Sequence, residues 1–480
     1  METFTRYRSL VDDWAAFQES LFQPLPLCIW ANPLRVTPDQ LADLFAAEGI
    51  QSEPLPWYPG GRQLDPDFRP GHHWAFLAGL YHTQEAVSML PVLLLDPQPG
   101  ERVLDLCAAP GNKTAQIAVR LANQGTVVAN DISGGRMRAA RQTFERLGLL
   151  NISTTVADGG NYPPAAGLFD KILVDVPCSC EGTTRKEPNV IERIGEAVSC
   201  KKSGSQKALL RKAVQLCRPG GRIVYATCTY APEENELVID AVLRDYPSLR
   251  LVSAEIEGLK TSDGITTWQE QALDPSLRLA RRIWPHHNDT GGFFIAVLEK
   301  DNNEAPRFNP ESSGDAPIAA EWPATISPEV RDLSQAVLDR FGLSLDDVAP
   351  NILFQPSNWR VYLVNADHRP CPAPAPDASG MIFIKTKGKY PKLSTAAAQL
   401  LGRQAIRNYV EVDDRQAGLY LARQDFDVPA AQSQFCTGPG YVLVRYRGFG
   451  LGVAIYYPHQ EGTGGLVQSL FPKGWSPVKG

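Results

Sequence analysis

Short apolar runs rich in β-branched residues alternate with stretches of helical periodicity through the middle of the chain. The strand-like runs read RVLDLC, TVVAND, ISTTVAD, FDKILVDV, RIVYATC and GGFFIAVLEK, and the pattern predicts helices over about 113–121, 135–147, 205–217 and 232–244. Strands that recur after helices indicate βαβ units, and hence an α/β fold with a mostly parallel sheet. Because such sheets bind ligands at the carboxyl ends of their strands, we expect one edge to gather Cys107, Asp131, Asp158, Asp175 and Cys228.

Weaker patterns flank this middle part. Before it, the sequence predicts a helical segment over Tyr7–Leu21, a strand over Leu27–Ala31 and a helix capped by Thr37, which together indicate a small α+β domain. After it, a stretch rich in Pro, Ser and acids indicates a linker, a second break lies at 368–380, and GYVLVRYRGFGLGVAIYYP indicates a small β-rich barrel. We expect an N-terminal domain over 1–75, a central domain over 76–300, a linker over 301–329 and a C-terminal region over 330–480.

Composition narrows the class of protein. The chain has 480 residues, of which 43% are hydrophobic and 21% charged, as in folded globular proteins. Its nine cysteines, an odd number spread over a long chain, do not suggest a disulfide framework. The N-terminus shows no apolar leader, and no run is apolar for long enough to span a bilayer. We therefore expect a monomer in the reducing cytoplasm, with no membrane partner.

Charge gives a divided signal about nucleic acids. The net charge of −6 argues mildly against a nucleic-acid partner, because phosphate contacts need Lys and Arg. Residues 381–410 nevertheless contain six basic residues and no acid, and a second basic group follows the first cysteine motif. Each stretch is as compatible with a solvated face as with an RNA contact. The second group consists of Arg185, Lys186, Lys201, Lys202, Lys207, Arg211 and Lys212.

A loop of small residues, DLCAAPGNKT, ends the first strand-like run. Gly111 lets backbone N–H groups approach a ligand, and a helix that begins near Lys113 offers its positive end. The loop is neither a Walker A motif nor G-x-G-x-x-G. Asp131 follows by roughly 20 residues, the spacing at which an acid accepts hydrogen bonds from ribose hydroxyls. A lone acid at a strand end more often caps a helix, but the series favours a nucleotide-like ligand, with Asp158 near its base and Asp175 facing the reacting centre.

Five motifs together resemble those of a known family. They are DLCAAPGNKT, VDVPCSCEGT, YATCTYAPEENE, LAGLYHTQEAVSML and GGFFIAVLEK, and they extend over about 77–299. The chain resembles the Sun-type RNA (cytosine-5-)-methyltransferases, which use S-adenosyl-L-methionine, and most of all their bacterial 16S ribosomal RNA (RsmF-like) branch. The resemblance implies a Rossmann-like methyltransferase sheet between an N-terminal RNA-binding domain and a C-terminal RNA-binding region that includes a PUA-like domain.

The resemblance also implies a role for each thiol. Carbon 5 of cytosine is a weak nucleophile, and a thiolate that adds to carbon 6 makes it reactive toward a methyl group. By resemblance Cys228 is that nucleophile, Cys178 assists breakdown of the adduct, and Asp175 stabilises charge near ring nitrogen 3. Related DNA enzymes use the Pro-Cys thiol as nucleophile, so an exchange of the two roles stays open. The expected cofactor-binding residues are Cys107, Ala108, Ala109, Pro110, Gly111, Asn112, Lys113, Asp131, Arg136, Asp158 and Asp175.

Three positions depart from the family pattern, which usually has glycine at Asn112 and Cys180 and serine at Ala226. Asparagine is tolerable at position 112 if its backbone is left-handed, a conformation that asparagine adopts better than most residues. Cys180 adds a third thiol near the other two. These departures leave the motifs recognisable.

Cysteine is often a core residue, and a single one at a strand end is more often structural than catalytic. Two that each precede a helix able to lower the thiol pKa favour catalysis for Cys178 and Cys228. We expect no metal, because PCSC has only one residue between its cysteines and no histidine belongs to an H-x-E signature. His286 and His287 are expected in a loop. The cysteines expected to be structural are Cys28, Cys200, Cys217, Cys371 and Cys436.

A cytosine inside a helix cannot be reached by a thiol, so the target must be unpaired or flipped. By resemblance it belongs to 16S ribosomal RNA or the small ribosomal subunit, and appended domains suit a large structured RNA. Three alternatives stay open: a transfer RNA cytosine-5 methyltransferase, a non-catalytic ribosome assembly factor, and a small-molecule methyltransferase, which the appended domains disfavour.

Overall fold

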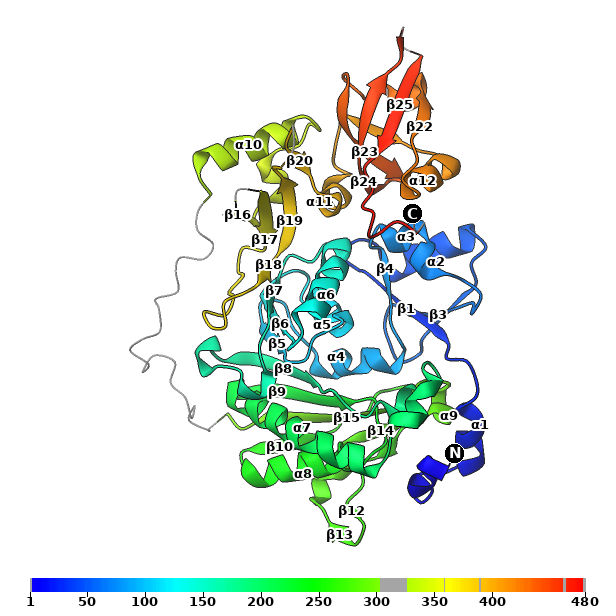
Figure 1. Cartoon of the computed structure of the whole chain (residues 1–480), viewed down its shortest axis with the longest axis vertical. Coiled ribbons are helices and arrows are strands. Elements are labelled where there is room, and N and C mark those ends of the chain that lie inside the picture. The colour runs from blue at the N-terminus through cyan, green and yellow to red at the C-terminus, as the bar shows by residue number, and fades with distance from the viewer. Residues whose placement is uncertain (1, 303–325, 358, 388–389, 461–462, 478–480) are drawn as a thin grey trace.

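The structure is a computed structural model that describes residues 2–302, 326–357, 359–387, 390–460 and 463–477 (Figure 1). Most of the expected linker over 301–329 lies outside these residues, and so does Lys389 of the basic stretch 381–410. The described residues form a central sheet with helices on both faces, a small N-terminal sheet, and two further small sheets in the C-terminal region.

Within the described part of the chain, the central sheet has ten strands. They are β5 (Arg102–Asp105), β6 (Thr126–Asn130), β7 (Ile152–Thr155), β8 (Phe169–Asp175), β9 (Cys217–Thr227), β10 (Leu249–Val252), β11 (Ser262–Asp263), β14 (Arg281–Ile283), β15 (Phe293–Lys300) and β18 (Ala378–Ser379). Their order is β11-β14-β15-β9-β8-β5-β6-β7-β18, and β10 pairs with β15. The five strands from β9 to β7 are parallel, whereas β15 and β18 pair antiparallel at either side. This arrangement confirms the predicted α/β methyltransferase-like fold.

Two apolar cores form on opposite faces of this sheet, because successive side chains of a strand point to opposite sides. Val103 of β5 belongs to the core that packs against the helices of one face, and Leu104 belongs to the other core. The first face carries α4 (Leu90–Leu95), α5 (Asn112–Arg120) and α6 (Gly134–Leu147), and the second carries α7 (Glu196–Leu216) and α8 (Glu236–Asp245). The remaining elements of this part are η3 (Val87–Met89), η4 (Gly159–Asn161), η5 (Pro164–Ala166), η6 (Glu181–Thr183), η7 (Pro188–Arg193), η8 (Pro275–Leu279), α9 (Pro285–Asn288) and the hairpin of β12 (Thr267–Trp268) and β13 (Gln271–Ala272).

The N-terminal part forms a sheet in the order β2-β3-β1-β4. The predicted helix behind Thr37 is present, with a capping box between Thr37 and Gln40. The single helical segment predicted over Tyr7–Leu21 is wrong, because Asp13 caps a new helix through its contact with the N–H of Ala16. The elements are η1 (Glu2–Tyr7), α1 (Trp14–Ser20), β1 (Leu27–Ala31), α2 (Pro38–Ala47), β2 (Ser52–Pro54), β3 (Gly61–Leu64), η2 (Pro70–His72), α3 (Trp74–Leu77) and β4 (Tyr81–Thr83).

The C-terminal region holds two sheets, one in the order β16-β17-β19-β20 and one in the order β21-β23-β24-β25-β22. The second contains the predicted β-rich strands. The elements are α10 (Pro328–Asp339), η9 (Leu345–Val348), β16 (Ile352–Ser357), β17 (Arg360–Val364), β19 (Met381–Lys385), β20 (Lys392–Leu393), α11 (Thr395–Leu401), β21 (Tyr409–Glu411), α12 (Asp414–Leu421), β22 (Phe426–Pro429), α13 (Ala430–Ser433), β23 (Gly440–Tyr446), β24 (Phe449–Pro458) and β25 (Gly464–Ser469).

The segment 368–380, expected only as a break, is part of the central fold. Its strand β18 extends the sheet by pairing with β7. Ser153 of β7 lies 2.7 Å from both His368 and Ser379 through its hydroxyl, and Cys371 is buried in the central core. The proline-rich segment therefore does not separate the C-terminal region from the central domain; it packs against the central domain.

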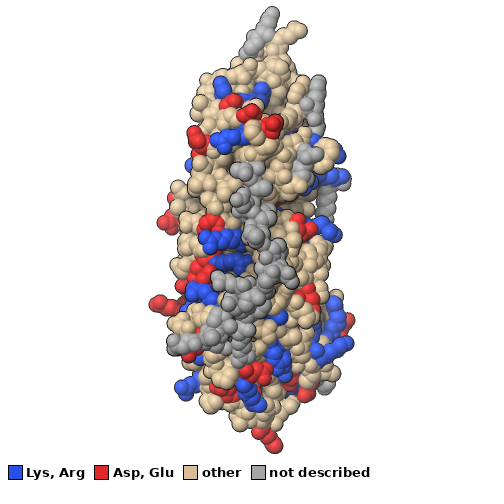
Figure 2. Space-filling model, turned by 90° about the vertical axis from the view of Figure 1, so that its left-hand side faces the viewer, with Lys and Arg blue, Asp and Glu red and all other residues tan. Residues whose placement is uncertain are grey.

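Helix α3 of the N-terminal part packs against the second C-terminal sheet (Figure 1), and the ring centres of Trp74 and Tyr446 lie 4.9 Å apart, edge to face. On the face of the molecule that Figure 2 shows, Lys and Arg are interspersed with Asp and Glu and gather most densely near mid-height. Among the described residues, no helix combines the length and the apolar character needed to cross a bilayer.

Candidate active site

The loop after β5 turns tightly and is tied to the neighbouring strands. The N–H of Ala108 donates to the carbonyl of Asn130, and the N–H of Gly111 donates back to Ala108, each at 2.7 Å. Gly111 has φ of 102°, and a Cβ there would come within 2.8 Å of Ala140 on α6. Glycine is therefore required both by the backbone angle and by the approach of α6. Helix α5 begins directly behind this loop, at Asn112.

Asn112 does not have the left-handed backbone that its place in the family pattern suggested. The left-handed residue is Gly111, whereas Asn112 is the first helical residue of α5. Its side-chain oxygen lies 3.1 Å from Nε2 of buried His82. Asparagine is accommodated because helical geometry suits any L-residue and the amide finds a partner.

The two acids expected to face a nucleotide occupy different environments. Asp131 is buried, and its oxygens accept the N–H groups of Ala109 at 3.1 Å and Ser133 at 2.9 Å. Arg136 reaches over the same loop and donates to the carbonyl of Ala109. Asp158 is exposed and caps η4 through the N–H of Gly160. Asp131 therefore fixes the conformation of the loop after β5, and it also lies at the carboxyl edge of the sheet.

Asp175 ends β8 in an ion pair with Lys113, whose Nζ lies 2.7 Å from the carboxylate. Burial opposes the charge of Lys113, but Asp175 and the nearby Cys228 together raise the lysine pKa. Below them Asp105 is buried and accepts a hydrogen bond from Thr114 at 2.6 Å. Burial raises the pKa of Asp105 to about 7. The expected cofactor loop and the expected reaction centre are therefore linked by the Lys113–Asp175 pair.

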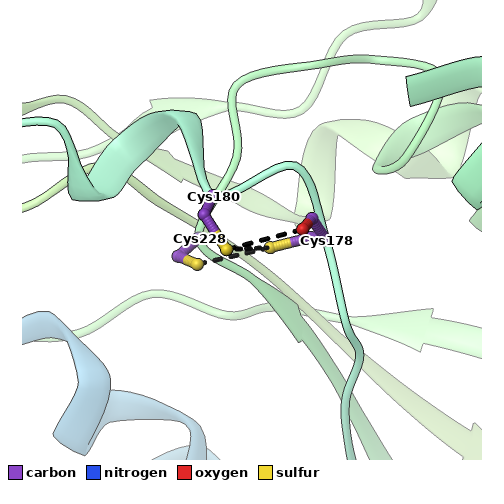
Figure 3. A group of neighbouring side chains, drawn as sticks. All are labelled: Cys178, Cys180 and Cys228. Atoms are coloured by element: carbon purple, nitrogen blue, oxygen red, sulfur yellow. Dashed lines mark hydrogen bonds between the residues drawn. The ribbon is translucent and has the colours of Figure 1, made fainter. Parts of the chain in front are cut away.

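Three thiols converge where β8 and β9 end (Figure 3). Cys178 and Cys180 lie on the loop after β8, and Cys228 follows β9 directly. The Sγ atom of Cys178 is 3.3 Å from that of Cys228 and 4.0 Å from that of Cys180. The parallel register explains the meeting, because Asp175 lies beside Ala226. Cys107 stands apart, packed beside the central core, and burial raises its thiol pKa.

The expectation that helices lower the pKa of both thiols is wrong for the free protein. Contacts with Cys180 and Cys228, together with burial, raise the pKa of Cys178. The contact with Cys178 lowers the pKa of Cys228, but Cys180, burial and Asp175 outweigh it and raise that pKa. Neither thiol sits at a helix terminus, since α8 begins only at Glu236 and η6 is a single turn. Cys180 instead has a lowered pKa, through contacts with Cys178 and Cys228 and the charge of Lys202.

Buried polar contacts hold the two cysteine loops together. The carboxylate of Glu181 accepts hydrogen bonds from the hydroxyls of Tyr7 and Thr229 and from the N–H of Tyr230, at 2.9 to 3.1 Å. The N–H of Gly182 donates to the carbonyl of Cys228 at 2.8 Å. Each motif therefore fixes the position of the other.

Two further expectations need correction. Arg185 is buried rather than part of an exposed basic group, and its guanidinium binds the carbonyls of Gln23, Pro24 and Thr290. His286 and His287 lie in the short helix α9 rather than in a loop, and both Nε2 atoms lie 2.8 Å from one oxygen of Asp12. Because α9 and Asp12 belong to segments far apart in sequence, no local pattern signals this contact.

Sequence reasoning missed two exposed apolar side chains beside the expected nucleotide acids. Ile132 directly follows Asp131 and is 74% exposed, and Val156 lies two residues before Asp158 and is 42% exposed. Water-exposed aliphatic side chains at such an edge suit contact with a flat, apolar ring. Their position after or beside a strand-tip acid was a usable signal. No sequence signal indicated the contact between Glu181 and Thr229, because that contact depends on the tertiary fold.

Comparison with known proteins assigns this arrangement to a family. The family described as 16S rRNA methyltransferase RsmB/F matches residues 92–299, the N-terminal domain of 16S rRNA methyltransferase RsmF matches 2–86, and the methyltransferase RsmF PUA domain matches 407–476. A tRNA (cytosine(49)-C(5))-methyltransferase of Pyrococcus abyssi is 35% identical over 62% of this chain and 94% of that protein. The chain belongs to the RsmB/F methyltransferase family.

Other members of the RsmB/F family differ in length. Ribosomal RNA small subunit methyltransferase F of Erwinia tasmaniensis is 34% identical over 62% of each chain. A methyltransferase homologue of known structure from Pyrococcus horikoshii has 34% identity and a TM-score of 0.55, over 62% of this chain and 93% of that one. The chain spans half or less of the length of eukaryotic relatives that are 35% identical to it.

Replacing Glu181 by alanine is expected to destabilise the protein by about 3 kcal/mol, because buried hydroxyl and N–H donors lose their shared acceptor. Glu181→Gln keeps an oxygen for most of these donors and is expected to cost less than about 1 kcal/mol. Urea unfolding of both variants, followed by tryptophan fluorescence, measures the difference. Equal stabilities for the two variants would show that the carboxylate does not hold the loops together.

Proposed function

We propose that this chain methylates carbon 5 of a cytosine in 16S ribosomal RNA, with S-adenosyl-L-methionine as methyl donor and Cys228 as covalent catalyst. The observation that carries the proposal is the approach of two thiols to 3.3 Å at the strand edge that also holds Asp175, in a chain of the RsmB/F family. Covalent chemistry on cytosine needs one thiol as nucleophile, and a second thiol in contact with it can assist the release of the adduct.

The residues at the edge fit the proposed cofactor. Its amino-acid end suits the glycine loop from Cys107 to Lys113, its ribose suits Asp131, and its adenine suits the exposed apolar side chains of Ile132 and Val156 near Asp158. Arg136 donates a hydrogen bond to the carbonyl of Ala109 in this loop. When bound, the cofactor supplies an electrophilic methyl group on a sulfonium.

The chain's own residues carry the covalent steps. Cys228 loses its proton to water, and its thiolate adds to carbon 6 of the cytosine, which makes carbon 5 nucleophilic. Carbon 5 takes the methyl group, and the electron pair of the broken bond stays on the donor's sulfur, which becomes a neutral thioether. Water then takes the proton from carbon 5, the ring double bond reforms, and the Cys228 thiolate leaves carbon 6. Cys178, in contact with Cys228, assists this breakdown. Because the pKa of Cys228 is raised in the free protein, loss of its proton is an early requirement of the reaction.

Asp175 positions the ring and stabilises charge near its nitrogen 3. Its pairing with Lys113 occupies one oxygen at 2.7 Å and leaves the other available for the base. Lys113 orients Asp175 and also limits the negative charge that collects around the three thiols. The pair therefore couples the cofactor loop to the position of the base.

A contiguous basic surface supports RNA as the partner. Two adjoining hollows of about 490 and 450 Å³ share Arg360, Tyr362 and Lys385. Side chains of α6 extend the first hollow, where Arg141 pairs with Asp377 and the half-buried Glu145 has Lys385, Arg360 and Arg141 as basic neighbours. Trp359 is 57% exposed at the second hollow, with Nζ of Lys387 5.3 Å from the ring centre. An exposed indole among cations suits stacking on an unpaired base beside its phosphates.

The cysteines provide the sharpest test of mechanism. We expect Cys228→Ala to form no covalent RNA adduct, and Cys178→Ala to accumulate one, because the first removes the nucleophile and the second slows its release. Denaturing gel electrophoresis with labelled ribosomal RNA separates the adduct. Adduct formed by the Cys228 variant and not by the Cys178 variant would show that the roles are exchanged.

The nature of the RNA is the second test. Matches to the RsmF N-terminal and PUA domains favour 16S ribosomal RNA, whereas the relative of which the chain covers 94% acts on transfer RNA. Bisulfite mapping compares the RNA of cells with and without the gene. We expect a methylated cytosine of 16S ribosomal RNA to be absent from the map of the cells without the gene. A loss in transfer RNA would favour the alternative. Binding of S-adenosyl-L-methionine without transfer to any RNA would favour an assembly factor.

The basic surface makes a separate prediction. Trp359→Ala is expected to weaken RNA binding roughly tenfold through lost stacking. Arg360→Ala should lower the slope of log affinity against log salt by about 0.7, as expected for one single-stranded phosphate contact. Arg250→Ala, at an exposed arginine on β10, serves as the control. Filter binding at several salt concentrations measures all three, and variants indistinguishable from the control would exclude this surface.

A further inference from the structure

The three converging thiols have a geometry that the proposed reaction does not need. Covalent catalysis and release use Cys228 and Cys178, yet Cys180 turns its sulfur toward the same point (Figure 3). All three sulfurs lie within 4.8 Å of one another. Cys180 also occupies a left-handed backbone position, with φ of 63°, where a side chain costs energy that glycine avoids.

These distances match those of thiolates around one metal ion. Tetrahedral zinc binds thiolate sulfur at about 2.3 Å, which places two such ligands about 3.8 Å apart. The distances from Cys178, 3.3 Å to Cys228 and 4.0 Å to Cys180, lie on either side of that value. Cys180 and Cys228 are partly exposed, so an ion could enter and keep a fourth position for water.

We propose that Cys178, Cys180 and Cys228 bind a single thiophilic divalent cation such as zinc, and that the bound ion blocks methyl transfer until it is removed. The block of methyl transfer rests on the proposed function, whereas the binding of the cation does not. Binding joins three thiolates and one dication in a complex of net charge −1, and each thiol that is still protonated releases its proton to water. The ion takes the lone pair of Cys228 that would otherwise attack cytosine.

The surroundings favour such an anionic complex. Lys113 interacts electrostatically with Cys228, and Lys202 does so with Cys180. The two lysines offset the net charge, while Asp175 is engaged by Lys113. The loops bearing the three ligands are already fixed by Glu181 and by the Gly182–Cys228 backbone hydrogen bond, so binding needs little ordering.

This site departs from the expectation that the chain holds no metal. The expectation considered the spacing of Cys178 and Cys180 along the sequence, and one intervening residue is too few for an ordinary zinc motif. The fold supplies the third ligand from β9. The cluster of Asp12, His286 and His287 does not support a second metal site. Asp12 already accepts hydrogen bonds from both imidazoles and, at 3.0 Å, from Lys260.

Cadmium titration of the full chain tests the proposal, because thiolate-to-cadmium charge transfer absorbs in the ultraviolet. We expect the wild type to bind one cadmium ion per chain. Cys180→Gly should bind cadmium at least roughly tenfold more weakly, because it loses one ligand at a position suited to glycine. Cys200→Ser, at an exposed cysteine on α7, is the matched control and should bind as the wild type does. Equal binding by the wild type and Cys180→Gly would overturn the site.

Zinc inhibition tests the blocking role. Methyl transfer by the wild type should fall with zinc and return with a chelator, and Cys180→Gly should need roughly tenfold more zinc. Inhibition that is identical in the two proteins would overturn the blocking role. If chelator-treated wild type transfers no methyl group to any RNA, the proposed function fails, while the cadmium titration still decides whether the site exists.

Discussion

The position of the two cysteine loops depends on one buried carboxylate. Glu181 belongs to the first cysteine motif, and its hydrogen-bond donors, Thr229 and Tyr230, belong to the second. Burial raises the pKa of Glu181, while its hydrogen bonds with Tyr7, Thr229 and Tyr230 act in the opposite direction. A buried acceptor with several donors is geometrically demanding, so the loops have few alternative arrangements. The approach of Cys178 to Cys228 follows from that restriction.

The same carboxylate connects the site to the N-terminus. Tyr7 donates to Glu181, and the rings of Phe4, Phe17 and Trp284 pack around Tyr230. Residues near the start of the chain thus pack against the cysteine loops. A chain shortened at this end would lose one donor to Glu181 and the aromatic cluster around Tyr230, so the N-terminal segment helps to hold the cysteine loops in place.

Local sequence signals predicted the sheet edge well, because each depends on a single strand and the turn behind it. The strand runs before Cys107, Asp131, Asp175 and Cys228 were readable in this way, and parallel pairing then brings their ends to one edge. Contacts between distant segments had no local signal. The pairing of β18 with β7, the burial of Arg185 and the inward turn of Cys180 all depend on tertiary packing.

The raised pKa of Cys228 and its closeness to Cys178 and Cys180 bear on both of the chemistries proposed for this site. A thiol of high pKa forms little thiolate at neutral pH, but the thiolate once formed is strongly nucleophilic. A cation and an activated cytosine compete for the same sulfur lone pair, and only the cation also gains from Cys180. In the proposed zinc complex the third thiol favours the cation over the cytosine, because only the cation binds its sulfur. The left-handed backbone of Cys180 carries that sulfur toward the other two.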